Sequence, residues 1–246
     1  MKKLILALAV ITTSAAYADE QKPDNQLTFN AAVTSDYRYR GISQTRLKPA
    51  LQAGMDYTNN PTGFYAGAWA SSIKWIEDAG GDSNMELDVY AGKRGNITDD
   101  FTYDVGVLTY LYNRNKLGDV PGFANANTTE IYAQLGYGPA YIKYSSSTTN
   151  LFGFVDSKNS GYVDVGANIE LSDSYILNLH AGHQEVENAS AASYDDWKIG
   201  VTKDFDVLTV ALAAIGTNAD ESAYASPANG KFLGKNALVL TLSKTF

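Results

Sequence analysis

The fold of this chain is decided by its last nine residues, which read Leu238-Val239-Leu240-Thr241-Leu242-Ser243-Lys244-Thr245-Phe246. In an extended strand, successive side chains point to opposite faces, so the three leucines share one face and most hydroxyl residues share the other. An oily face beside a hydroxyl face, ending on an aromatic residue, favours a strand between lipid and a polar lumen. Soluble edge strands can alternate in the same way, so the prediction depends on whether the pattern repeats upstream.

The alternation does repeat, in runs of about ten residues. Within 85–92 the odd positions are apolar, while Glu86 and Asp88 lie on the even face. A buried soluble strand would rarely carry two carboxylates on its second face unless that face were wet. Similar runs lie at 27–34, 51–57, 64–72, 101–107, 130–137, 140–145, 162–170, 175–182, 197–202, 208–214 and 238–246. They predict about twelve strands, and only for 64–72 do the small residues leave the facing open.

The connections between these runs are alternately short and long. Short turns are expected at 59–63, 94–100, 138–139, 172–174 and 204–206, and long polar loops at 38–49, 73–84, 113–126, 148–160, 185–193 and 216–236. Short periplasmic turns and long extracellular loops are typical of outer-membrane barrels. The predicted fold class is therefore all-β, a transmembrane antiparallel β-barrel. A secreted β-sandwich or a lipocalin-like barrel is the alternative, but either would bury an apolar inner face.

The N-terminal residues have the pattern of an export signal. Lys2 and Lys3 precede a short apolar run, and Ala16-Tyr17-Ala18 forms an A-x-A cleavage site. The apolar run is too short to span a bilayer, and no later run is long enough for a membrane helix. We predict a signal peptide at 1–18, a barrel at 19–246, and export through the periplasm to the outer membrane.

Composition narrows the partners. The chain has no cysteine, which excludes disulfides and thiolate metal sites, and its net charge of −8 argues against nucleic acid. The expected partners are outer-membrane lipids and lipopolysaccharide, small solutes or ions, and the barrel-assembly machinery through the C-terminal Phe246. No cofactor is expected.

The strongest functional signal is the charge of the predicted inner face. Its acidic residues are Asp56, Glu86, Asp88, Asp104, Glu130, Asp164 and Glu170, and its clear basic residues are Lys143 and Lys198. A lumen lined by one sign of charge concentrates counter-ions, so these positions predict a pore that prefers cations. The alternative is that the charges pair and fill the lumen, since a barrel of about twelve strands lies between filled and open sizes.

The segment from Arg38 to Gln44 allows two interpretations. Arg38 or Arg40 reaches the lumen from the first long loop and helps to set selectivity. Alternatively the segment is a structural corner, in which Gly41 permits a turn and Arg40 pairs with a luminal carboxylate such as Glu86 or Asp88.

Catalysis and metal binding receive little support. His180 and His183 fall on opposite faces of one strand, and no nucleophile motif such as G-x-S-x-G accompanies them. The loop acids Glu77, Asp78 and Asp82 lack the spacing of a calcium loop and are interpreted as a solvated acidic segment. We expect no enzymatic activity.

Aromatic residues and lysines mark the predicted membrane boundaries. A periplasmic ring is expected from Tyr57, Phe64, Phe101, Tyr137, Tyr175, Phe205 and Phe246, and an outer ring from Tyr37, Trp75, Tyr112 and Trp197. Lys93, Lys203 and Lys244 lie on the oily face near the periplasmic edge, where they can extend to the headgroups.

Two stretches resemble a known family. They read Thr34-Ser35-Asp36-Tyr37-Arg38-Tyr39-Arg40-Gly41-Ile42-Ser43-Gln44 and Gly63-Phe64-Tyr65-Ala66-Gly67-Ala68-Trp69-Ala70-Ser71. With Glu86-x-Asp88-x-Tyr90-x-Gly92 and Ser243-Lys244-Thr245-Phe246, they are similar to the TorF-like family of outer-membrane porins from proteobacteria. The chain departs from the family pattern at Lys93-Arg94 and at Tyr112-Asn113-Arg114, both at strand ends. The resemblance implies a porin and specifies no cargo.

Together these patterns predict a passive channel for ions or small solutes that prefers cations. The alternative is a non-conducting barrel, an adhesin or structural protein, whose long loops bind an external partner through aromatic residues such as Trp75, Phe152 and Phe154.

Overall fold

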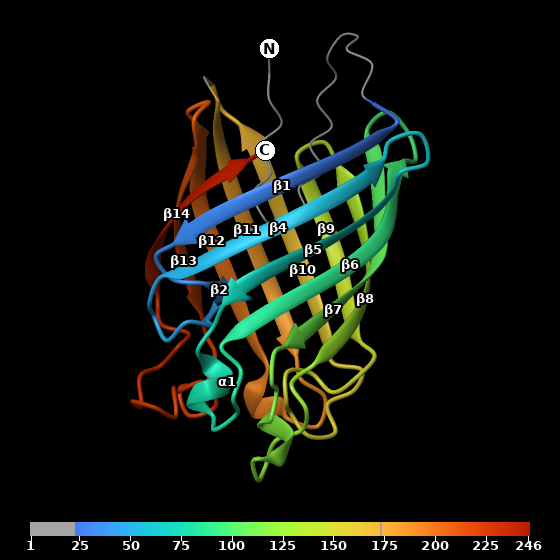
Figure 1. Cartoon of the computed structure of the whole chain (residues 1–246). Helices are drawn as coiled ribbons and strands as arrows, with labels where there is room; N and C mark the ends of the chain where they lie inside the picture. The colour runs from blue at the N-terminus through green and yellow to red at the C-terminus, as the bar shows by residue number, and fades with distance from the viewer. Residues whose placement is uncertain (1–22, 173) are drawn as a thin grey trace.

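A computed structural model describes residues 23–172 and 174–246. Twelve antiparallel strands close into one barrel (Figure 1). These strands are β1 (Asn25–Thr34), β4 (Ala50–Asn59), β5 (Phe64–Ser72), β6 (Met85–Asn96), β7 (Phe101–Tyr112), β8 (Thr128–Tyr137), β9 (Ala140–Ser147), β10 (Gly161–Glu170), β11 (Tyr175–Glu185), β12 (Tyr194–Asp204), β13 (Thr209–Thr217) and β14 (Ala237–Thr245). The fold prediction is confirmed, and the predicted signal peptide lies outside the described residues.

The remaining elements are short and lie in the long loops. A two-stranded ribbon of β2 (Arg38–Tyr39) and β3 (Ile42–Ser43) lies in the first loop. The helix α1 (Trp75–Asp78) and the 3₁₀ turns η1 (Leu117–Asp119) and η2 (Ser190–Ala192) lie in later loops. The described residues contain no helix that is long and apolar enough to cross a membrane.

The barrel closes where β14 meets β1. Val33 pairs with Leu242 in this seam, and Thr34 pairs with Thr241. The backbone N–H of Phe246 also donates to the carbonyl of Phe29 at 2.8 Å. Each remaining barrel strand pairs with its neighbours along the chain, so hydrogen bonding continues round the ring and leaves no open edge.

Side chains alternate between a buried polar lumen and an exposed apolar outer surface. On β6, Glu86 is 2% exposed and Asp88 is 8% exposed, while their outward neighbour Val89 is 44% exposed. β5, whose facing the sequence left open, turns Tyr65 and Trp69 inward, because both are buried. A polar inside and an apolar outside reverse the pattern of a soluble barrel and match a barrel in lipid.

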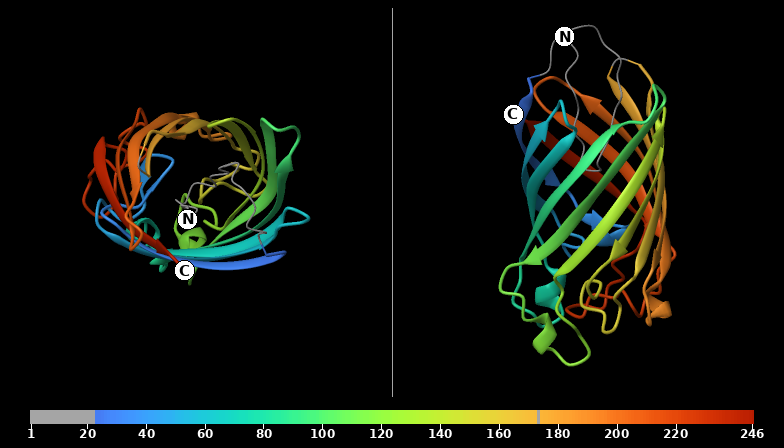
Figure 2. Two further views of the ribbon diagram at one scale, coloured as in Figure 1. Left: turned by 90° about the horizontal axis from the view of Figure 1, so that it is seen from above. Right: turned by 90° about the vertical axis from the view of Figure 1, so that its right-hand side faces the viewer.

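The long loops gather at one end of the barrel, opposite the C-terminus (Figures 1 and 2). Three apolar clusters bind these loops together. The first cluster includes Tyr37, Ile76 and Leu117 from three different loops. The second joins Ile42 of the first loop to Leu233 of the last loop.

The predicted periplasmic aromatic ring is exposed on the outer surface. Its members Tyr57, Phe64, Phe101, Tyr137, Tyr175, Phe205 and Phe246 are between 40% and 69% exposed. The three boundary lysines lie over aromatic rings. Lys203 Nζ is 3.7 Å from the Tyr175 ring centre, and Lys93 and Lys244 lie 5.1 Å and 5.7 Å from the rings of Phe64 and Phe246. These contacts fit lysines that extend along the lipid surface towards the headgroups.

The predicted outer aromatic ring is wrong for three of its four members. Trp197 lies on the outer surface and is 39% exposed, but Tyr37 and Tyr112 are buried, and Trp75 packs against their cluster. These three aromatics come from the loops and loop-proximal strand ends. They pack together at the end of the barrel that carries the long loops, instead of lying on the outer surface.

Candidate functional site

The first loop, residues 35–49, folds back onto the barrel interior. Its ribbon turns at Arg40 and Gly41, which have φ angles of 45° and 79°. A left-handed conformation costs a non-glycine residue about 1–2 kcal/mol, so other contacts must hold Arg40 in place. A Cβ on Gly41 would overlap the Thr217 side chain and lie 3.0 Å from Asp196 Cβ, so this position also needs glycine for close approach.

Asp36 fixes the shape of this ribbon. Its carboxylate accepts hydrogen bonds from Arg38 Nε at 2.6 Å, Ser43 Oγ at 2.5 Å and Thr45 Oγ1 at 3.3 Å. Arg38 Nη1 in turn donates to the carbonyls of Gly41, Leu233 and Lys235 at 2.9–3.0 Å. Arg38 therefore joins the first loop to the last loop, and this role is structural.

Residues 37–41 cross the lumen, and we call them the crossbar. At one end the Tyr37 hydroxyl donates to Glu86 on β6. At the other end Gly41 packs against Asp196 on β12. β6 and β12 are six positions apart in the ring of twelve strands, so they form opposite walls. Burial raises the pKa of the Tyr37 phenol well above its ordinary value, with a further increase from the Glu86 charge, so the phenol remains a donor.

The Arg40 guanidinium lies in a cage of four side chains. Nη1 donates to Gln184 Oε1 on β11 at 2.5 Å, and Nη2 donates to Glu130 Oε2 on β8 at 2.8 Å. The guanidinium carbon is 4.0 Å from the ring centre of Tyr162 and 4.8 Å from that of Tyr39. Arg40 thus pairs with a luminal carboxylate, as the corner interpretation predicts, but that carboxylate is Glu130 rather than Glu86 or Asp88.

The cage keeps Arg40 charged despite its burial. The Arg40 side chain is only 7% exposed. Burial lowers its pKa and the Glu130 carboxylate raises it, and the net result is a pKa well above the ordinary value.

The other acidic residues predicted to line the lumen lie on inward-facing positions. Asp56 accepts from Tyr90 and Asp104 accepts from Tyr65, each at 2.5 Å. Asp164 contacts His180 Nδ1 at 2.8 Å. Glu170 lies exposed at the periplasmic end of β10. Alternation thus places these acids on the inner faces of their strands, and lining a conducting pore stays a proposal for them.

Two oxygens in this set have no hydrogen-bond partner among the described residues. They are Asp88 Oδ1 and Asp104 Oδ2, and both are buried. Asp88 lies between Trp69 and Tyr110 in the strand register.

The basic residues on the inner face lie among the acids. Lys143 Nζ is 4.0 Å from the Tyr132 ring centre, and Lys198 lies next to His180 in the β11–β12 register. Arg94 donates to Thr58 at 3.2 Å and lies 5.0 Å from the Tyr65 ring centre.

The sequence predictions leave Arg94 and Asp196 off the inner face, and they place His180 there without its two carboxylate partners. Arg94 was assigned to a turn, but β6 continues through it to Asn96. Asp196 lies in β12 just before the predicted run at 197–202, and its alternation with Lys198 is the signal that extends this run. His180 lies between Asp164 and Asp196, at 2.8 Å and 2.7 Å.

His183 and the loop acids show no built catalytic or metal site. His183 faces outward and contacts Asp195 at 2.7 Å. The loop acids Glu77, Asp78 and Asp82 pair with Lys74, Arg46 and Lys116. Within residues 23–172 and 174–246, no group of three or more acidic or histidine side chains is placed to hold a metal ion.

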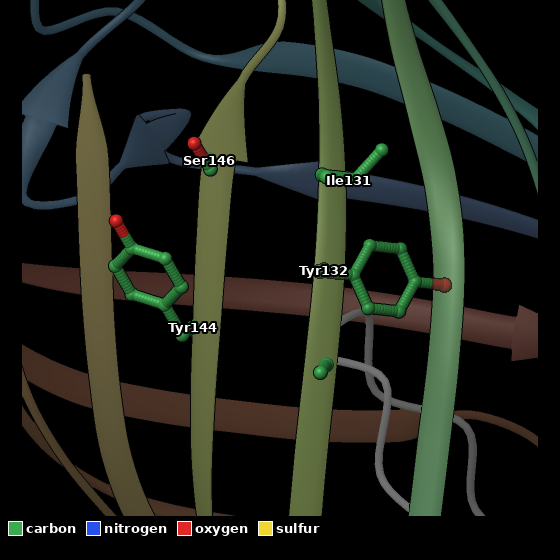
Figure 3. A pocket seen from close by; sticks show the side chains of 5 residues that line it. Ile131, Tyr132, Tyr144 and Ser146 are labelled. Atoms are coloured by element: carbon green, nitrogen blue, oxygen red, sulfur yellow. The ribbon is translucent and has the colours of Figure 1, made fainter. Parts of the chain in front are cut away.

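A small depression lies on the outer wall rather than in the lumen (Figure 3). Its volume is 190 Å³, and it is lined by Ile131, Tyr132, Ala133, Tyr144 and Ser146. Ile131 and Tyr144 are 54% and 50% exposed, so the depression belongs to the apolar outer surface.

Comparison with known proteins supports the fold and identifies a family. No curated protein gives a significant match to the sequence. The solved structure titled "KdgM porin" has a TM-score of 0.53 at 5% identity, covering 89% of this chain and 97% of that chain. A structure titled "NanC porin structure in rhombohedral crystal form" has a TM-score of 0.54 at 10% identity, covering 89% and 98%. At these identities the likeness shows the fold alone. Residues 18–246 match the family described as "Bacterial protein of unknown function (Gcw_chp)", and the chain belongs to this family.

Proposed function

We propose that this protein is an outer-membrane channel for passive diffusion of ions or small solutes, with a preference for cations. The charge of the inner face carries the proposal. Its acidic groups outnumber its basic groups within the described barrel. The acidic groups are Asp56, Glu86, Asp88, Asp104, Glu130, Asp164, Glu170 and Asp196, and the basic groups are Arg40, Arg94, Lys143 and Lys198. Such a surface attracts cations and repels anions.

The distribution of side chains on the inner wall and two similar structures support the proposal. β13, β14 and β1 contribute only small or uncharged inward residues, such as Ala213, Thr241 and Ala32. The charged groups lie on other parts of the ring. Two proteins of similar fold are titled porins. Because the crossbar spans the interior, we expect the conducting path to be narrow.

The test is single-channel recording of purified protein in a planar bilayer. The folded fraction is first verified by its heat-modifiable migration on gels. We expect discrete current steps from the folded barrel and none from the heat-denatured sample. Folded protein that gives no steps across a range of voltages would refute the channel.

The second candidate is a non-conducting barrel whose loops bind an external partner. The three apolar clusters favour it, because they hold the extracellular loops in a fixed arrangement that could present a binding surface. Phe123 and Val155 are 38% and 49% exposed on these loops. Cells that lose adhesion when residues 115–124 are deleted, from a barrel that shows no conductance, would favour this function.

Two partner proposals follow from the barrel. The apolar outer surface would contact membrane lipids and lipopolysaccharide. Phe246, which is 69% exposed, would be recognised by the barrel-assembly machinery. A Phe246→Ala variant that assembles as fast as the wild type would exclude the second proposal.

A further inference from the structure

The cage around Arg40 has the features of a guanidinium-binding site. Two different guanidinium nitrogens donate to two acceptors, Glu130 at 2.8 Å and Gln184 at 2.5 Å. The same group lies over the rings of Tyr162 and Tyr39. A planar fork of donors satisfies this arrangement, whereas a compact ammonium group cannot reach both acceptors and stack as well.

Most of the cage belongs to the barrel wall and is held independently of Arg40. Glu130, Tyr162 and Gln184 lie on β8, β10 and β11, and only Tyr39 comes from the crossbar. Gln184 Nε2 donates to the carbonyls of Gly161 and Glu185, each at 2.9 Å, which fixes its oxygen towards the cage. Tyr162 donates to Asp196 at 2.8 Å. The wall therefore retains a carboxylate, an amide oxygen and an aromatic ring if the first loop moves away.

The occupant is attached to a loop and sits in an unfavourable backbone conformation. Arg40 has a φ of 45°, which non-glycine residues rarely adopt. Its displacement would relieve this strain, while leaving Glu130 buried without a cation. A solute that supplies a guanidinium removes the cost of leaving Glu130 buried without a cation, because it replaces the contacts that Arg40 made.

We propose that the wall site formed by Glu130, Tyr162 and Gln184 binds guanidinium-bearing solutes, and that Arg40 occupies it as a built-in competitor when no solute is present. That such solutes are substrates of a channel rests on the proposed function. That the wall site binds them does not. Asp88 supplies a neighbouring position for a cation. Its buried Oδ1 has no partner among the described residues, and the Tyr110 hydroxyl across the strand register reaches Glu130 at 3.3 Å.

The first arm of the test vacates the site. Titration calorimetry of detergent-folded Arg40→Ala with methylguanidinium should show saturable binding. Methylammonium should bind at least about tenfold more weakly, since it loses one charged-site hydrogen bond and the stacking. Adding Glu130→Gln to Arg40→Ala should weaken methylguanidinium binding by at least about tenfold for the same reason. Arg94→Ala is the matched control and should create no methylguanidinium site. Arg94 also stacks on a tyrosine, but it has no carboxylate partner among the described contacts.

The second arm tests competition in the wild-type protein. Methylguanidinium should speed hydrogen–deuterium exchange of residues 37–44, and methylammonium at equal concentration and ionic strength should not. Absence of binding by folded Arg40→Ala, or equal binding when Glu130→Gln is added, would overturn the site. Unchanged exchange in the wild type would overturn the competition. If Arg40→Ala does not fold, the wild-type exchange decides alone. Neither arm measures current, so a barrel that binds without conducting would refute the channel and leave this inference standing.

Discussion

At the scale of single residues, Asp36 controls how the first loop enters the lumen. Its carboxylate accepts hydrogen bonds from Arg38 and from two hydroxyls. The ion pair is almost fully buried, with the Asp36 side chain 9% exposed and the Arg38 side chain 2% exposed. Removing one partner of a buried pair leaves the other charge uncompensated, which costs about 3–5 kcal/mol. We therefore expect Asp36→Ala to release the ribbon of β2 and β3.

Hydrogen–deuterium exchange of residues 36–45 measures this release. Exchange there should become much faster in Asp36→Ala, while exchange in the barrel strands stays unchanged. Glu77→Ala is the control, because its ion pair with Lys74 is about half exposed and such pairs contribute about 0–1 kcal/mol. Equal protection of the ribbon in Asp36→Ala and the wild type would contradict this role for Asp36.

A second prediction concerns the close approach of tyrosines to the inner wall. A Cβ on Gly106 would lie 2.5 Å from the Tyr132 hydroxyl. Gly106→Val should therefore displace Tyr132 and lower the free energy of unfolding by about 1–3 kcal/mol, the usual cost of overpacking. Ala133 faces outward, so Ala133→Val should change the free energy of unfolding by about 0.5 kcal/mol or less. Urea unfolding of both variants checks the difference, and equal stabilities would disprove the steric argument.

The inward acids could be predicted from sequence, but the partner of Arg40 could not. Strand alternation alone places Glu86, Asp88 and Glu130 on the inner face. The pairing of Arg40 with Glu130 depends on a left-handed backbone at Arg40 and on the path of the whole first loop. Neither feature has a periodic signal in the sequence.

At the scale of the strand, β14 allows a direct test of facing. Leu240 lies near the middle of β14 and is 43% exposed on the outer surface, whereas Thr241 points inward. Arginine on the lipid face near the midplane costs about 2–4 kcal/mol, and lumen positions tolerate charge better. We expect Leu240→Arg to lose about that much stability and Thr241→Arg to lose clearly less, measured by urea unfolding in lipid vesicles. The reverse order would show that the facing of β14 is wrong.

Elements with regular alternation were predictable, and those made by loop packing were not. The barrel strands and their short turns follow from period-two patterns and turn residues. The ribbon of β2 and β3 is too short to show a period. Tyr37, Trp75 and Tyr112 were placed at the lipid boundary because they lie at strand ends, yet the loops fold them into a shared cluster. Their burial depends on contacts between segments far apart in the chain.

At the scale of the whole molecule, the crossbar should limit conductance. Residues 37–41 extend between opposite walls, and the Arg40 side chain occupies the interior between β8 and β11. Arg40→Ala removes both bulk and a positive charge from the path, so we expect larger single-channel conductance and stronger cation preference. Arg40→Lys, which keeps the charge, should have a conductance and a cation preference between those of the wild type and Arg40→Ala. Conductance that is equal in all three proteins would show that ions do not pass the crossbar.

Cation selectivity is measured most directly by the zero-current potential of single channels under a potassium chloride gradient. An inner face with more carboxylates than basic groups predicts a potential of the sign produced by selective potassium flow. Asp164→Lys, which reverses one charge on this face, should shift the potential towards zero. Folded wild-type protein that forms no channels, or whose potential has the sign of chloride selectivity, would refute a cation-selective channel.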